Sequence, residues 1–292
     1  MSASRTTTRL SGATKAWIAV ALTWVSGFVD AVCYVTLFRV FVANMSGNSV
    51  AIGIGIGEGR WNLLFRRGFA VPLFFAGLVI CRLAVDWANQ QKIRRIFGWI
   101  FAVEAGLLGL FVAVGWGFVE GKRMTGISDA RYFTLIALPA VAMGLQNAAL
   151  THFGPLTVRT THVTGTLAKL ADHVARWLLW MRKRIRSAEG RRGLMRESVR
   201  HGSFRTASLL FAAWCGYVIG AATGAWLKTL IELSSLLVPI AILIALVAID
   251  WIDPFAVGRG EGEASRIEYR GSSIEDRVSR IEDRGSERRG SE

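Results

Sequence analysis

Long uncharged apolar runs occupy most of residues 16–252 and are separated by short polar or charged segments. A helix needs about 20 predominantly apolar residues to cross the hydrocarbon core of a bilayer. The pattern therefore predicts an all-α polytopic membrane protein with about six transmembrane helices. We expect these spans near 17–38, 68–88, 96–118, 131–153, 206–227 and 231–252.

Two polar interruptions of this pattern resemble each other. The first joins GFVDA at 27–31 to MSGN at 45–48, and the second joins GLQNA at 144–148 to VTGT at 163–166. In each case the second half of an apolar helix is followed by a polar break that contains glycine and by the start of another helix. The sequence thus places unusual residues at membrane depth twice, in the same order.

A further match lies beyond each interruption. GLVIC at 77–81 resembles GYVIG at 216–220, so the correspondence continues into the next apolar helix. We interpret the membrane domain, residues 16–252, as an internal duplication, with repeat one near 16–118 and repeat two near 131–252.

The relative orientation of the two copies depends on two short helices, expected near 46–57 and 164–180. Three spans in each copy invert the second copy in the membrane, whereas four spans keep the copies parallel. The second short helix carries Lys169, Asp172 and Arg176 on one face, and each uncompensated charge near the bilayer centre costs about 2.5–3.5 kcal/mol. We therefore expect re-entrant or interfacial short helices and an inverted repeat, with eight spans in a parallel 4+4 repeat as the alternative.

Basic residues exceed acidic ones, with 35 Lys and Arg against 21 Asp and Glu and a formal net charge of +14. Such a charge suits nucleic-acid binding, but nine Lys or Arg and only two Glu are concentrated in one loop at 181–205. Basic loops between spans lie in the cytoplasm, so the charge indicates topology rather than a nucleic-acid partner. We expect a plasma-membrane protein with both termini and this loop in the cytoplasm, where the loop contacts anionic lipid.

The two ends of the chain differ from the membrane domain. Residues 1–15 form a basic N-terminal segment, and the apolar run that follows is longer than the core of a secretory signal, so we expect an uncleaved first helix. Arg, Glu, Asp, Gly and Ser dominate from Gly258 onward. Because these residues cannot bury a core, we expect a disordered charged tail at 253–292.

Polar residues inside the apolar pattern mark a candidate solute site. An ionised Asp30 in the first span needs a partner or a proton, and Asn147 replaces it in the second copy. Two helix starts at membrane depth would present partial positive charge to a common cavity, which suits a polar or anionic solute. The structural alternatives are glycine-mediated helix packing and, for Asp30, an ion pair with Arg39 or Arg82 or a hydrogen bond to backbone. The candidate site comprises Asp30, Asn44, Ser46, Gly47, Asn48, Asn147, Thr164, Gly165 and Thr166.

A second carboxylate, Glu104, lies within another apolar run. It forms either an intramembrane charge pair with Arg82 or a second proton site. Glycines at four-residue spacing favour close helix contact in lipid, here either within the chain or between the subunits of a homo-oligomer. The glycines concerned are Gly216, Gly220 and Gly224.

Enzymatic and metal chemistry have no support in the sequence. Cys33, Cys81 and Cys215 lie in apolar segments without CxxC spacing, and the four histidines show no metal-binding arrangement. A nucleophile elbow, a phosphate-binding loop and a dinucleotide fingerprint are also absent from the sequence. We expect no catalytic residues, no metal and no cofactor.

Four motifs relate the chain to known proteins: GFVDA at 27–31, FVANMSGN at 41–48, AMGLQNA at 142–148 and VRTTHVTGTL at 158–167. With them the chain resembles the YoaK family, multi-pass membrane proteins defined by a domain of unknown function, over roughly residues 15–252. His162 stands where such proteins often have tyrosine, and the basic loop is long for the family. The resemblance implies an integral plasma-membrane protein and supplies no established substrate or catalytic residue.

The leading functional hypothesis is a transporter or channel for a small polar or anionic solute. Duplication with polar breaks in opposed halves is an architecture that alternating access uses. The alternative is a non-transporting membrane scaffold or regulator that binds through its basic loop. An intramembrane enzyme ranks third, and the lipid bilayer is a partner under every hypothesis.

Overall fold

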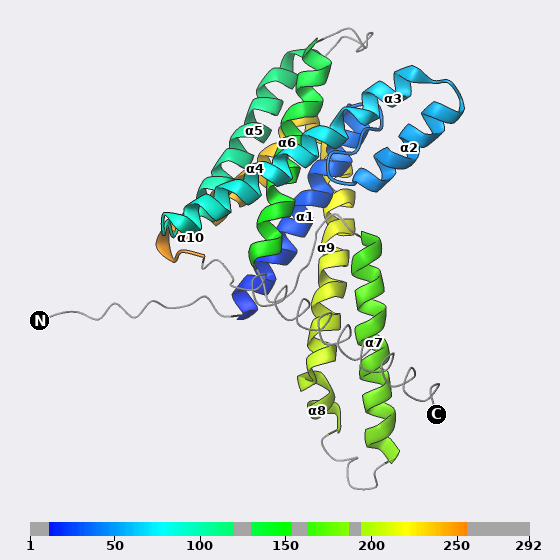
Figure 1. The fold of residues 1–292 in the computed structure, drawn as a ribbon, viewed down its shortest axis with the longest axis vertical. Coiled ribbons are helices and arrows are strands. Elements are labelled where there is room, and N and C mark those ends of the chain that lie inside the picture. Colours follow the sequence, from blue (N-terminus) through cyan, green and yellow to red (C-terminus); the bar gives the residue numbers. More distant parts are fainter. Residues whose placement is uncertain (1–11, 120–129, 154–162, 187–193, 256–292) are drawn as a thin grey trace, which may run out of the picture. The chain divides into compact units, whose positions relative to one another are not determined.

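The structure is a computed structural model that describes residues 12–119, 130–153, 163–186 and 194–255, all within one compact unit. Helices occupy almost all of these residues, and no strand occurs among them, which confirms the predicted all-α fold class. The predicted tail beyond residue 255 lies outside the described residues. The elements (Figure 1) are α1 (Gly12–Thr36), α2 (Met45–Gly57), α3 (Trp61–Gly68), α4 (Ala70–Gln90), α5 (Ile96–Val119), α6 (Ala130–Phe153), α7 (Val163–Arg186), α8 (Leu194–Arg200), α9 (Gly202–Ile231), η1 (Glu232–Leu236) and α10 (Leu237–Ile252).

Five stretches are long and apolar enough to cross a membrane: Thr14–Thr36, Leu64–Gln90, Ile96–Trp116, Ala130–Thr151 and Gly202–Ile252. The last contains two helices, α9 and α10, because the chain turns at η1, where Glu232 has a φ of 50°. One helix of these 51 residues would be about 77 Å long, against a hydrocarbon core of about 30 Å. The long helices α1, α4, α5, α6, α9 and α10 therefore coincide with the six apolar runs of the sequence.

Helices α1 and α6 run antiparallel. The hydroxyl of Tyr132, near the start of α6, donates to the carbonyl of Leu37, just past the end of α1, over 3.5 Å. The side-chain amide of Gln146, near the end of α6, donates to the carbonyl of Leu22 in the first half of α1. We call the two sides of the membrane domain the α1-start side and the α1-end side. α6 begins on the α1-end side and finishes on the α1-start side.

Helix α4 follows the direction of α6. Phe69, directly before α4, contacts Phe133 near the start of α6, with ring centroids 4.9 Å apart. Further along both helices, Gly77 of α4 lies against Gly144 of α6. α4 therefore also begins on the α1-end side, which requires α5 to begin on the α1-start side.

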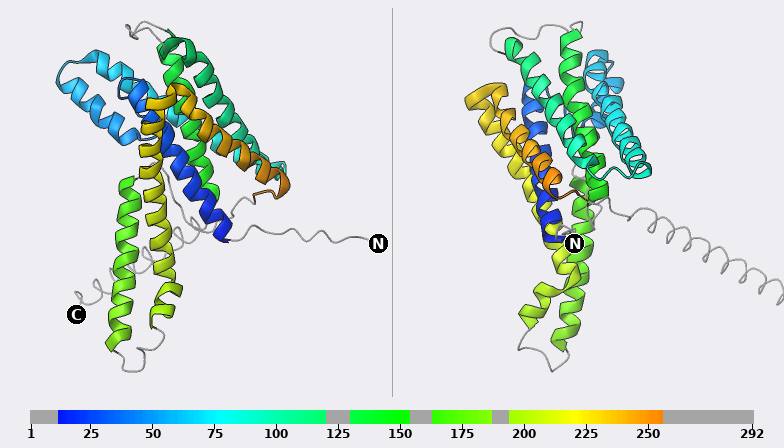
Figure 2. Two further views of the ribbon diagram at one scale, coloured as in Figure 1. Left: turned by 180° about the vertical axis from the view of Figure 1, so that it is seen from behind. Right: turned by 90° about the vertical axis from the view of Figure 1, so that its left-hand side faces the viewer.

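Helix α9 instead follows the direction of α1. Gly216 faces the carbonyl of Val20, and Gly224, two turns later, faces that of Phe28 two turns along α1. α10 turns back after η1 and pairs with α5 in antiparallel fashion. Figures 1 and 2 show these helices from three directions. The first helices of the two halves, α1–α5 and α6–α10, thus point in opposite directions.

The chain enters the hairpin of α2 and α3 from the α1-end side and leaves it on the same side. α2 has 13 residues, about 20 Å of helix, which is too short to cross a core of about 30 Å. It packs against α3 and α4, and α4 starts on the side where α1 ends. The first half therefore follows the predicted path with a non-crossing short helix near 46–57, and not the path that eight spans require.

The second predicted short helix was wrong in length. Instead of ending near residue 180, α7 continues to Arg186 and has 24 residues. It lies along the first part of α9 (Figure 2), where Leu170 packs on Leu210 and Ala213. Its charged residues occupy exposed positions. The helix is longer than predicted because its apolar face is covered by α9 rather than by lipid.

The predicted basic loop at 181–205 is also corrected, since it is mainly helical where the structure describes it. α7 ends at Arg186, α8 covers Leu194–Arg200 and α9 begins at Gly202. The indole N–H of Trp177 donates to the hydroxyl of Ser198 over 2.9 Å, and the ring of Trp180 packs at a tilt against that of His201, with centroids 4.6 Å apart. These contacts fold α7, α8 and the first part of α9 into one unit, which we call the basic hairpin.

Glycine allows α1 and α9 to approach until their backbones touch. A Cβ at Gly27 would overlap the carbonyl of Tyr217, three residues before Gly220. Conversely, a Cβ at Gly220 would overlap the carbonyl of Trp24, three residues before Gly27. Small residues permit such close packing in membranes. The stripe of Gly216, Gly220 and Gly224 is therefore used within the chain, one of the two predicted alternatives.

The same reciprocal contact joins α4 to α6. Gly77 faces the carbonyl of Val141, three residues before Gly144, and Gly144 faces that of Phe74, three residues before Gly77. In both contacts a helix from one half packs on the first helix of the other half. The sequence match had paired Gly77 with Gly216, whereas the contacts pair Gly77 with Gly220, one helical turn later.

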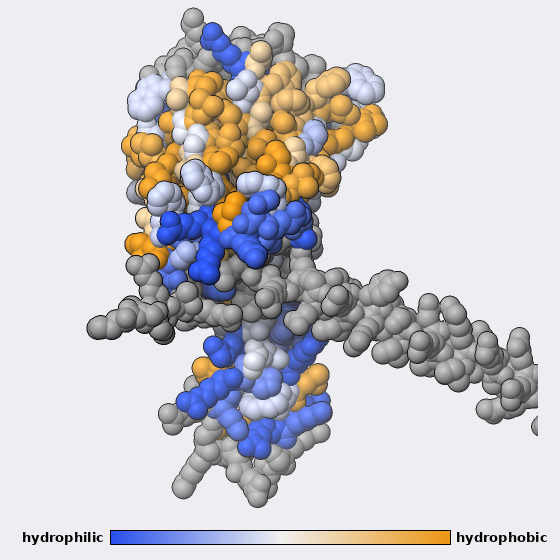
Figure 3. Space-filling model, turned by 60° about the vertical axis from the view of Figure 1, so that its left-hand side comes forward, coloured by the Kyte–Doolittle hydropathy of each residue, from blue (hydrophilic) through white to orange (hydrophobic). Residues whose placement is uncertain are grey.

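The outer surfaces of the long helices are apolar. Exposed large apolar side chains occur along α4, α5, α9 and α10, and Figure 3 shows a broad hydrophobic region on one face, with hydrophilic residues gathered below it. Four exposed tryptophans lie at helix ends on the α1-start side, as in the aromatic belts of membrane proteins. They are Trp17, Trp87, Trp99 and Trp251.

The glycine contacts give a stability prediction. Replacing Gly144 by alanine puts a methyl group into the backbone of α4, so we expect the free energy of unfolding to fall by about 1–3 kcal/mol. At Gly106 of α5 a Cβ meets nothing within 4 Å, and the same change there is neutral or stabilising by about 0.5–1 kcal/mol. Thermal unfolding of both variants in detergent measures the difference. Equal stability of the two variants would contradict the close contact.

Candidate functional site

The candidate site in the first half is built around a chain reversal after α1. Phe38 and Arg39 have positive φ values of 52° and 65°, and the N–H groups of Leu37 and Arg39 donate back to carbonyls in the last turns of α1. This turn directs residues 40–44 back along α1 before α2 begins. The start of α2 is therefore set back from the α1-end side, at the depth of Asp30.

Asp30 holds this reversal through three hydrogen bonds. Its Oδ1 accepts from the N–H groups of Val42 and Ala43 over 2.7 and 2.9 Å. Its Oδ2 accepts from the hydroxyl of Tyr217 over 2.7 Å. The carboxylate is 2% exposed, so burial of its charge is offset by donors from the break and from α9. Of the alternatives left open by the sequence, Asp30 makes hydrogen bonds to backbone.

Asn48 ties the break to α2. Its Oδ1 accepts from the N–H of Phe41 over 3.1 Å, and its Nδ2 donates to the carbonyl of the same residue over 2.6 Å. A Cβ at Gly47 would lie 2.9 Å from the ring of Phe41, so glycine leaves room for that ring. Asn48 and Gly47 are thus committed to holding the reversal rather than to facing a cavity.

The first turn of α2 is more open. Asn44 occupies the N-cap position without capping a backbone N–H, and its Oδ1 instead accepts from the hydroxyl of Ser46 over 2.7 Å. Ser46 is exposed. A helix start with uncapped N–H groups carries partial positive charge. Asn44 and Ser46 are therefore the members of this group that are placed to meet a solute.

The described residues of the second half show only part of a comparable arrangement. Asn147 is 3% exposed in α6, and Thr166 is buried at the start of α7, where Thr164 and Gly165 are exposed. The break between α6 and α7, residues 154–162, lies outside the described residues. Phe74 takes the place of Tyr217 in the glycine contact. Where Asp30 becomes Asn147, its hydroxyl partner thus becomes a phenyl ring.

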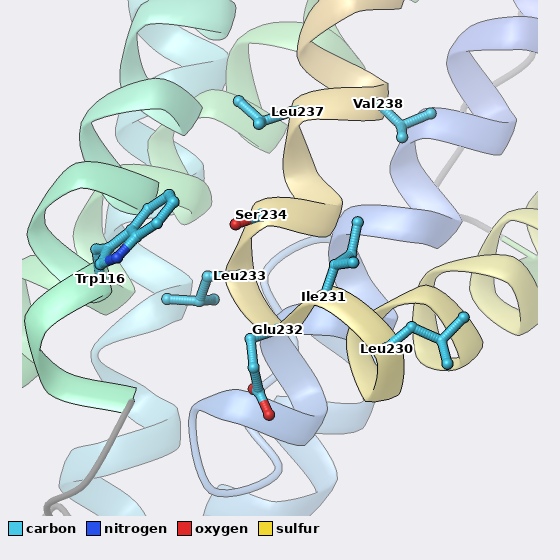
Figure 4. A pocket seen from close by; sticks show the side chains of 8 residues that line it. All are labelled: Trp116, Leu230, Ile231, Glu232, Leu233, Ser234, Leu237 and Val238. Carbon is cyan, nitrogen blue, oxygen red and sulfur yellow. The ribbon is translucent and has the colours of Figure 1, made fainter.

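The structure groups the predicted residues by half. Asp30, Asn48 and the start of α2 form one cluster beside α3 and α4, whereas α7 begins beside α9. Neither of the two cavities described next is lined by a predicted site residue. One, of about 510 Å³, is a mainly apolar hollow between Trp116 and the turn around η1 (Figure 4). The other, of about 440 Å³, adjoins the reversal and is lined by Tyr34, Val35, Phe38 and Arg39.

The predicted charge pair of Arg82 and Glu104 is not formed. Arg82 Nε lies 3.1 Å from Asp86 Oδ2, one turn along the same exposed face of α4. Glu104 is fully buried, and neither of its carboxylate oxygens has a hydrogen-bond partner in the described structure. A partner on the same helix face at i+4 is nearer than one across a helix interface.

Two functional-looking residues were missed from the sequence. Tyr217 was hidden because its role depends on a partner 187 positions away. Asp250 accepts from the N–H groups of Gly98 and Phe255 over 2.9 and 2.7 Å and so joins the end of α10 to the start of α5. The only sequence signal for Asp250 is a buried carboxylate at the edge of an apolar run.

Comparison with known proteins agrees with this architecture. Residues 18–249 match the family model described as "Protein of unknown function (DUF1275)". The chain belongs to this family. It is 29% identical over 161 residues to "UPF0700 transmembrane protein YoaK" of Bacillus subtilis (strain 168), which covers 54% of this chain and 67% of the relative. No solved structure matches the chain.

Membership of this family confirms the resemblance to YoaK seen in the sequence. The matched segment runs from the first turns of α1 almost to the end of α10. Both breaks, both glycine contacts and the carboxylates Asp30 and Glu104 thus lie within the family's shared region. The protein is a multi-pass membrane protein of the YoaK type.

The second prediction concerns Asp30. We expect the stability of the reversal to depend on a side-chain oxygen that accepts hydrogen bonds at this position, and not on its negative charge. Asp30→Ala leaves two buried N–H groups unpaired, and we expect a loss of about 2–4 kcal/mol in the free energy of unfolding. Asp30→Asn keeps an oxygen for both N–H groups and an amide that donates to the Tyr217 oxygen, so we expect a loss below about 1 kcal/mol. Unfolding curves of the two purified variants test this. A loss in Asp30→Asn as large as that in Asp30→Ala would show that the charge itself is required.

Proposed function

We propose that the protein is a transporter or channel for a small polar or anionic solute. The observation that carries the proposal is that α1 and α6 are antiparallel and that the helices after them, α2 and α7, run toward opposite sides of the membrane domain. Helices α2 and α7 thus begin inside the membrane domain and point to opposite sides. Transporters with inverted repeats use paired helix starts of this kind to bind solutes near the bilayer midplane.

The electrostatics of the α2 start support a polar or anionic solute. The N-cap residue Asn44 leaves the first-turn N–H groups uncapped, and the nearest carboxylate, Asp30, is already satisfied by three donors. The first-turn N–H groups of α2 are therefore the donors that we propose to meet the solute. The role we propose for the protein is not enzymatic.

The distribution of charge supports an orientation in the plasma membrane. Lys15, Lys92, Arg94 and Arg95 lie at helix ends on the α1-start side, as does the basic hairpin. The positive-inside rule then places this side, and both termini with it, in the cytoplasm. In this orientation α2 runs from its start toward the outside of the cell, and α7 runs from its start toward the cytoplasm.

Flux through the reconstituted protein tests the proposal. Proteoliposomes are loaded with chloride, nitrate, sulfate, phosphate or acetate in turn, and efflux is compared with that of protein-free vesicles. We expect at least one solute to move only with protein. Asn44→Ala lowers this flux about tenfold, since loss of one polar contact to a bound anion costs about 1–2 kcal/mol.

Ser49→Ala is the matched control for Asn44→Ala. Ser49 is exposed one turn further along α2, and its hydroxyl donates to the carbonyl of Met45 in the same helix. We expect its removal to leave flux unchanged. Flux that is lost equally in both variants would indicate damage to α2, and protein-dependent flux of none of the solutes would count against transport.

A second candidate function rests on the basic hairpin. Its helices are held together by the Trp177–Ser198 hydrogen bond and by the ion pair of Arg184 with Glu197 at 3.2 Å. A folded unit that exposes basic side chains at the membrane suits anionic lipid or an acidic partner protein. In this scaffold role the hairpin would act without any solute movement.

Charge neutralisation of the hairpin separates the two functions. Arg182, Lys183 and Arg200 are exposed, so their joint replacement by glutamine keeps the fold. If the hairpin is a scaffold, we expect the variant to lose retention of anionic lipid during purification, measured by native mass spectrometry, because each basic residue contributes about 1 kcal/mol. If transport is the function, flux persists in the same variant. Unchanged lipid retention would remove the scaffold hypothesis.

A further inference from the structure

Glu104 is the least satisfied polar group in the described membrane domain. It lies on α5, eight residues after Ile96, which places it about 12 Å into a span of about 30 Å. Its side chain is fully buried, and neither carboxylate oxygen has a hydrogen-bond partner. Buried polar groups in proteins are nearly always paired, and an exception requires an explanation.

A second unpaired acceptor lies at the same depth. A Cβ at Gly115 would lie 3.6 Å from a methyl carbon of Leu135, so these two residues are neighbours in the antiparallel pair of α5 and α6. Glu104 lies eleven residues before Gly115, and Gln146 lies eleven after Leu135. The Oε1 atom of Gln146 is also buried without a partner, while its Nε2 donates to the carbonyl of Leu22. Three acceptor oxygens thus lie at one level with no donor between them.

Among the residues that the structure describes, no neighbouring group supplies a positive charge to Glu104. On α4, Cys81 is close enough to Glu104 to interact electrostatically, and Arg82 is engaged with Asp86. On α6, residues 133–151 contain no titratable side chain. On α10, the single titratable group Asp250 accepts from backbone N–H groups, and on η1 Glu232 pairs with Lys228 at 3.5 Å. The surroundings of Glu104 are therefore neutral.

From this geometry we propose that Glu104 is a proton-binding site within the membrane domain. An unpaired carboxylate in an apolar interior costs several kcal/mol more than the neutral acid. One proton removes the charge and gives the carboxyl group an O–H donor at the level of the unpaired Oε1 of Gln146. The proton binds to one carboxylate oxygen as an O–H bond and leaves by the reverse step, so no other reactant is required.

The location of Glu104 links its charge to the contact between the halves. Cys81 lies one helical turn beyond Gly77, and Gly77 touches Gly144 of the other half. Deprotonation would require water or a cation beside this tight contact, which has no room for either unless α4 and α6 separate. The role of Glu104 in coupling proton movement to solute movement rests on the proposed function, whereas proton binding itself does not.

Infrared spectroscopy of the full chain in lipid nanodiscs tests proton binding directly. A protonated carboxylic acid in an apolar site absorbs in its C=O stretching region, apart from ionised carboxylates. At neutral pH we expect this band in the native chain, its loss in Glu104→Gln, and its persistence in Asp86→Asn, which removes the neighbouring exposed, ion-paired carboxylate. Glu104→Asp keeps a carboxyl group at the site, and we expect it to shift the band. This variant replaces Glu104→Gln in the test if the glutamine variant does not fold.

Three results would overturn the proposal. The first is a native spectrum without a protonated-acid band, and the second is a band that Glu104→Gln leaves intact. The third is a band that disappears when sodium chloride replaces choline chloride at equal ionic strength, because a metal cation would then be the occupant. None of these requires solute flux.

The coupling step has a separate readout. In the proteoliposome assay we expect Glu104→Gln to retain exchange of the transported solute and to lose the response to an imposed pH gradient, about a tenfold change in initial rate for one pH unit in the native chain. A pH response that persists in Glu104→Gln would refute coupling through this residue and leave the infrared result unaffected.

Discussion

A chain that reverses inside a bilayer must satisfy its own backbone, because lipid offers no hydrogen bonds. The reversal between α1 and α2 meets this constraint with two side chains. Asp30 accepts from Val42 and Ala43, and Asn48 pairs with both polar groups of Phe41. Without these acceptors α2 would begin at the membrane surface rather than at the depth of Asp30. The polar residues that look like a binding site are thus first of all the means by which the site is built.

The same carboxylate joins the two halves. Tyr217 belongs to α9, yet its hydroxyl completes the set of donors around Asp30 in α1, beside the point where Gly27 and Gly220 bring the two backbones together. Each half therefore supplies a helix to the other, and the position of α2 depends on both. A displacement of α9 along α1 would move the Tyr217 hydroxyl relative to Asp30 and so disturb the start of α2.

The sequence predicted what depends on local pattern and missed what depends on distant partners. Apolar runs located the long helices, and the polar motifs located the reversal. The glycine register was misjudged because glycine recurs every four residues in α9, so similarity with GLVIC favoured Gly216 over the contacting Gly220. The length of α7 was underestimated because charged residues after Trp177 look like a loop until α8 and α9 cover the apolar face. Arg82 was considered as a partner of Glu104 or of Asp30, although Asp86 lies one turn away on its own helix.

The two halves differ at two positions that are in contact with each other, which a comparison of single residues does not reveal. Asn147, at the position that matches Asp30, carries no charge. Phe74, at the position that matches Tyr217, has no hydroxyl and so needs no carboxylate as its acceptor. Hydrogen bonds to an ionised group are roughly twice as strong as neutral ones, so an amide at position 30 would keep the reversal and hold it only slightly less firmly. Either change alone would leave a buried polar group with a weaker partner or none. Asp30 and Tyr217 therefore depend on each other, and the matching positions of the second half, Asn147 and Phe74, lack both the charge and the hydroxyl.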